Sequence, residues 1–152
     1  MTWAYEDFTE NRVFPLPQTL VSAEDIIAFA REFDPQPMHL DEEAGRASLL
    51  GGLSASGWHT SSIFMRMICD AFLIQSTAQG SPGIDELRWR RPVMAGDMLS
   101  GSSTVLSRRI LKSRPWLGLV TFRHEVRNQH AEAVLEGVNP ILFRLREPGD
   151  AA

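Results

Sequence analysis

Hydrophobic positions recur with helical spacing in the first part of the chain. The apolar residues that follow Ser22 at this spacing are Ile26, Phe29, Ala30 and Phe33. They predict a helix with one apolar stripe. Ser22, with Asp25 three residues later, resembles a capping box at the start of that helix. We expect the helix to end where Asp34-Pro35 begins, because the residue before a proline disfavours helical backbone angles.

Two further helices are predicted before residue 75. Asp41 can cap a short helix over residues 42–47, whose first turn carries two acidic residues, as the helix dipole prefers. The run from Trp58 to about Ile74 is apolar on nearly every side, a pattern typical of a buried helix. Arg66 and Asp70 interrupt this run with the i, i+4 spacing of an ion pair on one helix face.

The pattern changes to an alternation of apolar and polar residues after residue 83. Long strands are predicted at about 84–91, 98–111, 116–128 and 131–145. Earlier in the chain, residues 12–14 can form a short strand that Pro15 and Pro17 end. Helices followed by a meander of long antiparallel strands predict an α+β domain. A curved sheet of this kind can wrap around the apolar helix.

Composition and charge are those of an ordinary globular chain of 152 residues, 43% hydrophobic and 22% charged. We expect one domain over residues 1–152, with a loose arm at about 1–11 whose Trp3, Tyr5 and Phe8 are available for docking, and a polar tail at about 146–152. The net charge of −4 argues against a protein that follows a nucleic-acid backbone, since such a protein needs a basic face. The sequence shows neither an export signal nor a membrane span, so a cytoplasmic protein is expected.

Cys69 is the only cysteine, which excludes an internal disulfide and a cysteine-based zinc site. It lies among apolar residues and is interpreted as a small core residue. His59 is expected to be packed and bonded to a backbone group, whereas His124 and His130 are expected to be structural or solvated.

The segment between the first two helices carries the candidate chemistry. It reads Phe33-Asp34-Pro35-Gln36-Pro37-Met38-His39-Leu40-Asp41. The prolines keep it stiff and non-helical, so that the Asp34 carboxylate and the His39 imidazole can point at one place. One carboxylate and one imidazole can transfer protons near neutral pH. The alternative is a turn aspartate beside a surface histidine. A metal site that adds Asp41 is only weakly indicated, and no metal is expected.

These residues resemble a known family, the MaoC-like dehydratases of the hot-dog superfamily. The motif that carries the resemblance is Asp34-x-Gln36-Pro37-x-His39-x-Asp41. It is similar to the family signature Asp-x-Asn-Pro-x-His-x-Asp, with Gln36 in place of the asparagine. Ser56-Gly57-Trp58 stands where the family usually has His-Gly-Met, and residues 83–89 and 92–97 resemble the family's first long hairpin. The resemblance spans about residues 20–145. It implies a hot-dog fold, a curved antiparallel β-sheet wrapped around a long central α-helix.

The resemblance also implies an activity, the hydration of a trans-2-enoyl thioester to a 3-hydroxyacyl thioester or the reverse dehydration. In such proteins the signature aspartate and histidine, here Asp34 and His39, hold and activate a water molecule. A backbone N–H at the start of the central helix, here that of Gly57, polarises the thioester oxygen. A glycine there would let the ligand approach the backbone closely. Ser56 is a further candidate for substrate binding.

Ser62 aligns with a family serine that hydrogen-bonds the catalytic aspartate, and Ser61 is its rival by one position. The expected substrate is an acyl-CoA thioester, with coenzyme A as part of the substrate and no separate cofactor. Arg88, Arg90 and Arg91 could meet its phosphates, although arginines on a strand are usually a solvated face. We expect a homodimer or higher homo-oligomer, because a single hot-dog leaves an edge strand and an apolar flank that pairing would cover.

Two other functions remain open at this point. A thioesterase on the same fold also needs Gly57 and a water activated by a carboxylate, but it attacks the thioester carbon. A non-catalytic acyl-binding or regulatory domain would bind acyl-CoA without turnover, and the intact pair of Asp34 and His39 argues against it. Under these alternatives Gly57 is simply a residue that starts a helix, and Ser62 is a small residue that packs close to the loop.

Overall fold

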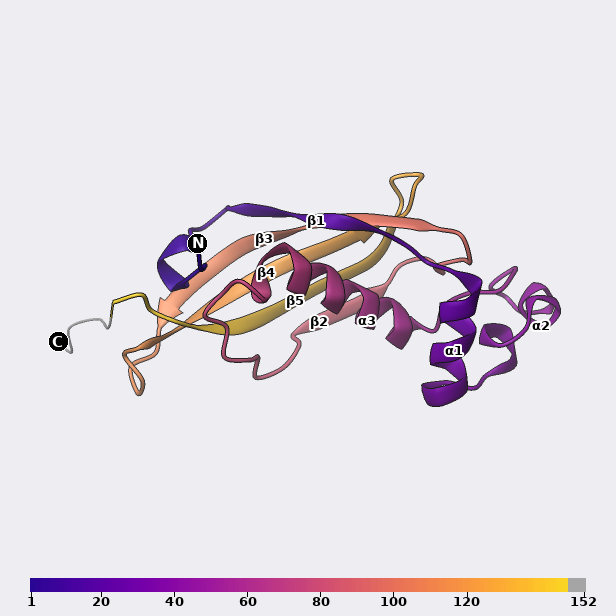
Figure 1. Cartoon of the computed structure of the whole chain (residues 1–152), viewed down its shortest axis with the longest axis horizontal. Helices are drawn as coiled ribbons and strands as arrows, with labels where there is room; N and C mark the ends of the chain where they lie inside the picture. Colours follow the sequence, from indigo (N-terminus) through magenta and orange to yellow (C-terminus); the bar gives the residue numbers. More distant parts are fainter. Residues whose placement is uncertain (148–152) are drawn as a thin grey trace.

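A computed structural model describes residues 1–147, so most of the predicted polar tail, residues 148–152, lies outside the described residues. One five-stranded antiparallel sheet curves around a long helix, α3, which lies against one of its faces (Figure 1). The strands are β1 (Val13–Leu20), β2 (Glu86–Trp89), β3 (Met98–Ile110), β4 (Leu117–Arg127) and β5 (Ala133–Arg144). The helices are α1 (Ala23–Phe33), α2 (Glu42–Ala47) and α3 (Gly57–Ile68). The predicted α+β class and hot-dog fold are confirmed.

The strand order β1-β3-β4-β5-β2 departs from the expected meander at one place. Strands β3, β4 and β5 follow one another as antiparallel neighbours, but β2 pairs with β5 at the far edge. The expected hairpin of 83–89 with 92–97 is therefore wrong. The segment that connects β2 to β3, residues 90–97, is instead bonded to residues earlier in the chain; we name it the crossing segment. Its backbone hydrogen bonds run from Ala55 N to Val93 O (2.8 Å) and from Gly96 N to Val21 O (2.7 Å).

Strand β1 is longer than predicted and contains both prolines that were expected to end it. Within residues 1–147 it pairs with β3 alone, with Pro15 opposite Ser102 and Leu16 opposite Gly101. An edge strand tolerates proline because the missing N–H groups can face away from the neighbouring strand. The register shifts between Leu16 and Thr19, after which the strand continues to Leu20.

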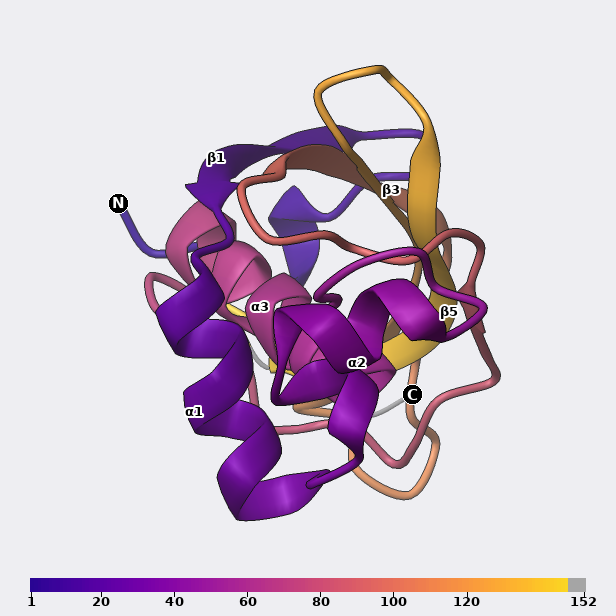
Figure 2. The same cartoon turned by 90° about the vertical axis from the view of Figure 1, so that its right-hand side faces the viewer.

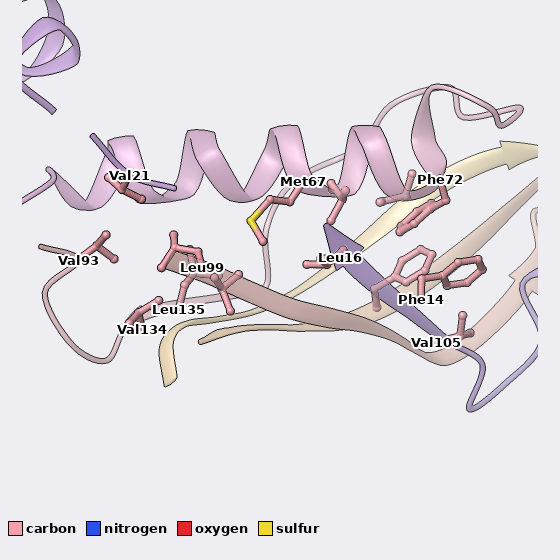
Figure 3. Close-up of a cluster of buried hydrophobic side chains, with 14 of the residues drawn as sticks. Phe14, Leu16, Val21, Met67, Phe72, Val93, Leu99, Val105, Val134 and Leu135 are labelled. Atoms are coloured by element: carbon pink, nitrogen blue, oxygen red, sulfur yellow. The ribbon is translucent and has the colours of Figure 1, made fainter. Parts of the chain in front are cut away.

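The core lies between the sheet and one side of α3. Figure 3 shows Met67 and Phe72 reaching from the helix toward Phe14, Leu16 and Leu99. The opposite side of the helix is not buried, which corrects the prediction of a helix buried all round. Two large apolar residues of α3 are exposed, Trp58 (60% exposed) and Met65 (48%).

The central helix continues beyond α3 as a π-helical turn, Cys69–Leu73, so the predicted extent to about Ile74 is confirmed. The predicted ion pair is also present, with Arg66 Nε 2.9 Å from Asp70 Oδ1. Burial raises the pKa of the half-buried Cys69 thiol. Within the part of the chain that the structure describes, no helix has both the length and the apolar character to cross a membrane.

The N-terminal arm is docked rather than loose. Phe8 is fully buried and stacks among the core aromatic rings, with its centroid 4.1 Å from that of Phe143. The ring of Tyr5 covers Gly118 so closely that a Cβ atom there would lie 2.0 Å from Tyr5 Cδ2. The arm is therefore not loose, and the aromatic residues that were expected to be available for docking complete the core at the end of the sheet that lies away from α1 (Figure 1).

Helices α1 and α2 gather beyond the N-terminal end of α3 (Figure 2). Both predicted caps are confirmed: Ser22 Oγ accepts from Asp25 N at 3.1 Å, and Asp41 Oδ2 accepts from Ala44 N at 2.9 Å. Helix α2 packs tightly on the segment before α3, because a Cβ atom on Gly45 would lie 2.3 Å from Gly52 O. The segment between α1 and α2 is thus held beside the start of the central helix.

A hydrogen-bonded histidine, His124, is buried inside the sheet face that meets α3. Its Nδ1 lies 2.7 Å from Ser103 Oγ and its Nε2 lies 2.7 Å from Asn139 Oδ1. Burial lowers the pKa of His124 from 6.5 to about 4, against a smaller opposite effect of the Asn139 hydrogen bond. His124 is therefore neutral at pH 7 and structural, as predicted, whereas His130 is exposed.

The low pKa of His124 predicts a loss of stability in acid. Between pH 6.5 and about 4 the unfolded chain binds a proton at this position that the folded chain does not, so the free energy of unfolding falls as the pH falls. We expect His124 to contribute a loss of about 3 kcal/mol across this window and none above it. Urea unfolding at several pH values measures the effect.

The matched variant His124→Gln should lose less stability between pH 6.5 and 4 than the wild type. A comparison with this variant is needed because burial also lowers the pKa of His59, which acts in the same direction. Equal pH slopes for the two proteins would contradict the prediction.

Candidate active site

The candidate catalytic segment begins where α1 ends. The Asp34 N–H still bonds to Ala30 O at 2.9 Å, but the backbone of Asp34 is no longer helical, with φ −150° and ψ 70°. Pro35 disfavours helical backbone angles at Asp34, which agrees with the end of α1 at this residue. Pro37 then starts a single 3₁₀ turn, Pro37–His39, which the prediction of an entirely non-helical segment missed. Proline fits at that first position because its missing N–H needs no partner there.

A backbone carbonyl fixes the orientation of His39. The Nδ1 atom of this buried imidazole lies 2.7 Å from Ser54 O, and a carbonyl can only accept a hydrogen bond. Nδ1 therefore carries the proton, and in the neutral ring Nε2 has a free lone pair. Ser54 is itself held by a bridge to Met94 and by the neighbouring bond from Ala55 N to Val93 O.

The structure brings Asp34 and His39 together, with 3.6 Å between Asp34 Oδ2 and His39 Nε2. The hydroxyl of Ser56 and the side-chain amide of Gln36 lower the pKa of Asp34, so its carboxylate is charged at neutral pH. A carboxylate and a neutral Nε2 are both hydrogen-bond acceptors, and they do not bond to each other. The site thus presents two acceptors to one small volume.

Gln36 holds the Asp34 carboxylate directly. Its Nε2 donates to Asp34 Oδ1 at 2.7 Å. This bond leaves Oδ2 facing His39. Side chains two residues apart in an extended segment lie on the same side, and this spacing is the signal that could have identified the contact.

Unpaired polar groups surround the start of α3. Its N-cap residue Ser56 makes no side-chain capping bond, and the first hydrogen bond across the helix start runs from Thr60 N to Ser56 O. The N–H groups of Gly57 and its immediate successors have no acceptor within the helix. The hydroxyls of Ser54 and Ser56 are buried, and among the described residues neither has a hydrogen-bond partner of normal geometry. Buried donors without partners are rare, which points to a ligand at this end of the helix.

A cavity of about 280 Å³ opens between His39 and this helix start. Gly57, Ser54 and Trp89 belong to its wall, and Arg90 and Arg91 stand at its edge. Both arginines are already paired, Arg90 with Glu136 at 2.7 Å and Arg91 with Glu132 at 3.1 Å. We name this space the reaction cavity. Among residues 1–147, no three histidine, cysteine, aspartate or glutamate side chains are grouped so that they could hold a metal ion.

Comparison with known proteins supports the resemblance seen in the sequence. The family model of the MaoC-like domain matches residues 8–126, which include the candidate catalytic segment and α3. The chain belongs to the MaoC-like domain family.

Two solved structures and one curated protein illustrate the similarity of this MaoC-like chain to others. The MaoC-like dehydratase from Rhodospirillum rubrum is 41% identical, with a TM-score of 0.88 over 95% of this chain and 98% of that one. The uncharacterized protein YdeM of Bacillus subtilis is 30% identical over 91% of this chain and 97% of its own length. The (R)-hydratase PhaJ1 from Pseudomonas aeruginosa, at 21% identity, shares the fold, with a TM-score of 0.77 over 95% and 88% of the two chains.

In this MaoC-like protein the serine beside the catalytic segment is not the one expected. The Ser62 hydroxyl donates to Trp58 O at 2.8 Å, and its rival Ser61 donates to Gly57 O at 3.1 Å. The predicted bond from Ser62 to Asp34 is therefore wrong, because Ser62 lies on the exposed side of α3. The hydroxyl near the Asp34 carboxylate is that of Ser56.

The reason given for glycine at position 57 also needs correction. A Cβ atom there would lie 2.5 Å from Cδ2 of the Trp89 indole, so the space beside the glycine is filled by protein and not left for a ligand. Trp89 also donates from Nε1 to Ser61 Oγ at 3.0 Å. The sequence analysis missed Trp89, because its position depends on the pairing of β2 with β5.

His59 is packed, as predicted, but its ring stacks on Phe29 with centroids 4.8 Å apart. The expected bond to the backbone is missing at Nδ1, which has no partner among the described residues. His59 lies outside the reaction cavity defined above.

Proposed function

We propose that this MaoC-like protein adds water to a trans-2-enoyl thioester, or removes it from a 3-hydroxyacyl thioester, with coenzyme A as the carrier. The observation that carries the proposal is the pair of acceptors, Asp34 Oδ2 and His39 Nε2, 3.6 Å apart beside the start of α3. The similarity to a MaoC-like dehydratase and to an (R)-hydratase supports the same reaction class.

The two acceptors suit a water molecule that acts as a nucleophile. Such a water can donate one hydrogen to Asp34 and the other to His39, which leaves its oxygen lone pairs free to attack Cβ. An imidazole is intrinsically a stronger base than a carboxylate of lowered pKa, so His39 Nε2 is the better acceptor for the proton released. The adjacent carboxylate stabilises the imidazolium that forms.

The same proton can complete the reaction. As the C–O bond forms at Cβ, electron density moves through the double bond to the thioester oxygen, and protonation at Cα then restores the thioester. His39 returns the proton to Cα on the face where the water added, so the pair ends in the state in which it began. In the dehydration direction each step runs in reverse.

The start of α3 can stabilise the charge that develops on the thioester oxygen. The unpaired N–H of Gly57 lies at the positive end of the helix dipole and borders the reaction cavity. The unpartnered hydroxyl of Ser54, which lines the same cavity, is a further donor, whereas the hydroxyl of Ser56 faces Asp34. Preorganised donors of this kind favour the transition state over the substrate.

The direct experiment is to follow the loss of the 2-enoyl thioester absorbance with enoyl-CoA substrates that are short, medium, branched and dicarboxylic. We expect decay for at least one of them, with the 3-hydroxyacyl-CoA as product and no free thiol. Thiol release with a saturated acyl-CoA would instead identify a thioesterase. Binding of acyl-CoA without either reaction would overturn the enzymatic proposal.

We also propose that two copies associate through β2. This strand is an edge of the sheet, and Trp89 and the neighbouring Ile84 and Trp58 are exposed apolar side chains. An exposed edge with apolar neighbours favours pairing with a second strand. Sedimentation velocity tests this, since a monomer at micromolar concentration would contradict it.

A further inference from the structure

A second cavity, of about 290 Å³, runs along the exposed side of α3. Phe64, Met65 and Ile68 of the helix form one wall, and Leu87 of β2 faces them. At 1.5 Å per residue, the stretch from Ser61 to Ile68 lies about 6–16 Å along the helix beyond Gly57. We name this space the distal cavity, because it is the place that the far part of a bound acyl chain would reach.

Trp89 lies between the two cavities: it lines the reaction cavity and contacts residues that line the distal cavity. Its indole covers Gly57, which borders the reaction cavity, and it donates a hydrogen bond to Ser61, which borders the distal cavity. The indole is 45% exposed and makes an edge contact with Trp58, 5.1 Å between centroids. An acyl chain that reached the distal cavity would pass along this indole, which is held by its packing on Gly57, one neutral hydrogen bond and one edge contact.

The distal cavity is apolar except for a few groups; among these, His124 is buried and Asn139 is half-buried. Within residues 1–147, the only hydrogen-bond partner of the buried Ser103 hydroxyl is His124 Nδ1. A buried hydroxyl proton needs an acceptor, so Ser103 donates and Nδ1 accepts. Nε2 then carries the ring proton and donates to Asn139 Oδ1.

These hydrogen bonds determine that the Asn139 amide accepts from His124 through its oxygen and keeps its nitrogen as a donor. With Oδ1 engaged by His124, the Nδ2 group has a single long contact among the described residues, 3.4 Å to Ser81 Oγ. An amide nitrogen carries two protons, so at least one donor of Asn139 is left for the cavity. An alkyl chain would bury that donor without a partner, which is unfavourable.

We propose, on the basis of the function proposed above, that the acyl substrate carries an uncharged oxygen, a keto or hydroxyl group, near its far end, and that Asn139 Nδ2 donates a hydrogen bond to it. The oxygen is uncharged because Glu86 lines the same cavity, and its carboxylate repels a second carboxylate. Asn139 is thus a specificity-determining residue, remote from Asp34 and His39.

The test compares two thioesters of equal length, 2-octenoyl-CoA and the same molecule with a keto oxygen on the carbon next to the terminal methyl. We expect kcat/KM to be about tenfold higher for the keto substrate, the effect of one neutral hydrogen bond in a buried site. In Asn139→Asp an oxygen still accepts from His124 but the amide donor is lost, so the preference should disappear. An equal rate for the two substrates in the wild type, or a preference unchanged in Asn139→Asp, would overturn the proposal.

Substitutions at Gly137 test where the acyl chain binds. It borders the distal cavity, and a Cβ atom there would lie 3.4 Å from Glu86 O, so Gly137→Ala fits whereas Gly137→Leu fills the cavity. Gly137→Leu should lower kcat/KM for both octenoyl substrates at least about tenfold and leave 2-butenoyl-CoA unaffected. Loss of activity on all three thioesters alike would contradict the binding of the acyl chain in the distal cavity.

Binding separates this inference from the reaction itself. Calorimetry with octanoyl-CoA and its keto analogue, neither of which can be hydrated, should show the same preference of about tenfold. That preference without hydration of any enoyl-CoA would retain the distal site and reject the hydratase. Hydration of an enoyl-CoA without the preference would retain the hydratase and reject the distal site.

Discussion

Asp34→Asn is expected to lower the turnover of enoyl-CoA at least about 10²–10⁴-fold, the range typical of groups that act in acid–base catalysis. The substitution keeps the shape of the side chain but removes the charge that Ser56 and Gln36 stabilise. It also replaces one acceptor oxygen by a donor, so a water molecule can no longer give a hydrogen to each member of the pair. Steady-state kinetics with the best substrate of the panel measures the loss, and circular dichroism checks that the fold is kept.

The signature itself supplies the matched control, Asp41→Asn. Asp41 belongs to the same motif, but its carboxylate caps α2 through Ala44 N at 2.9 Å. Asparagine caps helices about as well as aspartate, so turnover should stay close to that of the wild type. A folded Asp34→Asn protein with undiminished turnover would reject the proposed chemistry.

His39→Gln is expected to reduce turnover by a similar factor of about 10²–10⁴. Glutamine can still donate an N–H toward Ser54 O, but it provides no basic nitrogen where Nε2 lies 3.6 Å from Asp34. The matched control is His130→Gln, since His130 is exposed and should contribute nothing to turnover. The measurement is kcat across the pH range in which the wild type is active.

The double variant Asp34→Asn/His39→Gln shows whether the two groups act as a unit. Both are proposed to hold one water molecule, so removal of either should already abolish that arrangement. The losses should therefore not multiply, and the double variant should be about as slow as the slower single variant. Losses that multiply fully would indicate two independent steps.

Features set by neighbouring residues could be predicted from the sequence. The caps Ser22 and Asp41 and the end of α1 at Asp34-Pro35 depend on contacts within a few positions, and the structure agrees with each of them. The alternating burial along β4, in which His124 shares the buried face with Val120, Phe122 and Val126, agrees with the alternation of apolar and polar residues. The pair of Asp34 and His39 followed from a stiff segment between two helices, and the structure brings both side chains to one place.

Features set by distant parts of the chain could not be predicted in this way. The place of β2 beside β5 depends on a crossing segment that binds to Val21 and Ala55. Trp89 covers Gly57 only because of that placement. The sequence placed Ser62 beside Asp34, where the structure has Ser56, for a similar reason. The rotation of α3 about its axis is fixed by packing on the sheet and not by local sequence.

The prolines of β1 bear on how many copies can assemble. The two edges of the sheet are unlike: β2 offers its backbone groups, whereas β1 lacks N–H groups at Pro15 and Pro17. A strand from another molecule cannot form a regular ladder along the β1 edge. If two copies paired through β2, each would use the edge that can bind another strand. Only the two β1 edges would remain exposed, and neither could add a third copy to the sheet. In the proposed dimer, Pro15 and Pro17 would thus limit the assembly to two copies and oppose the growth of fibres.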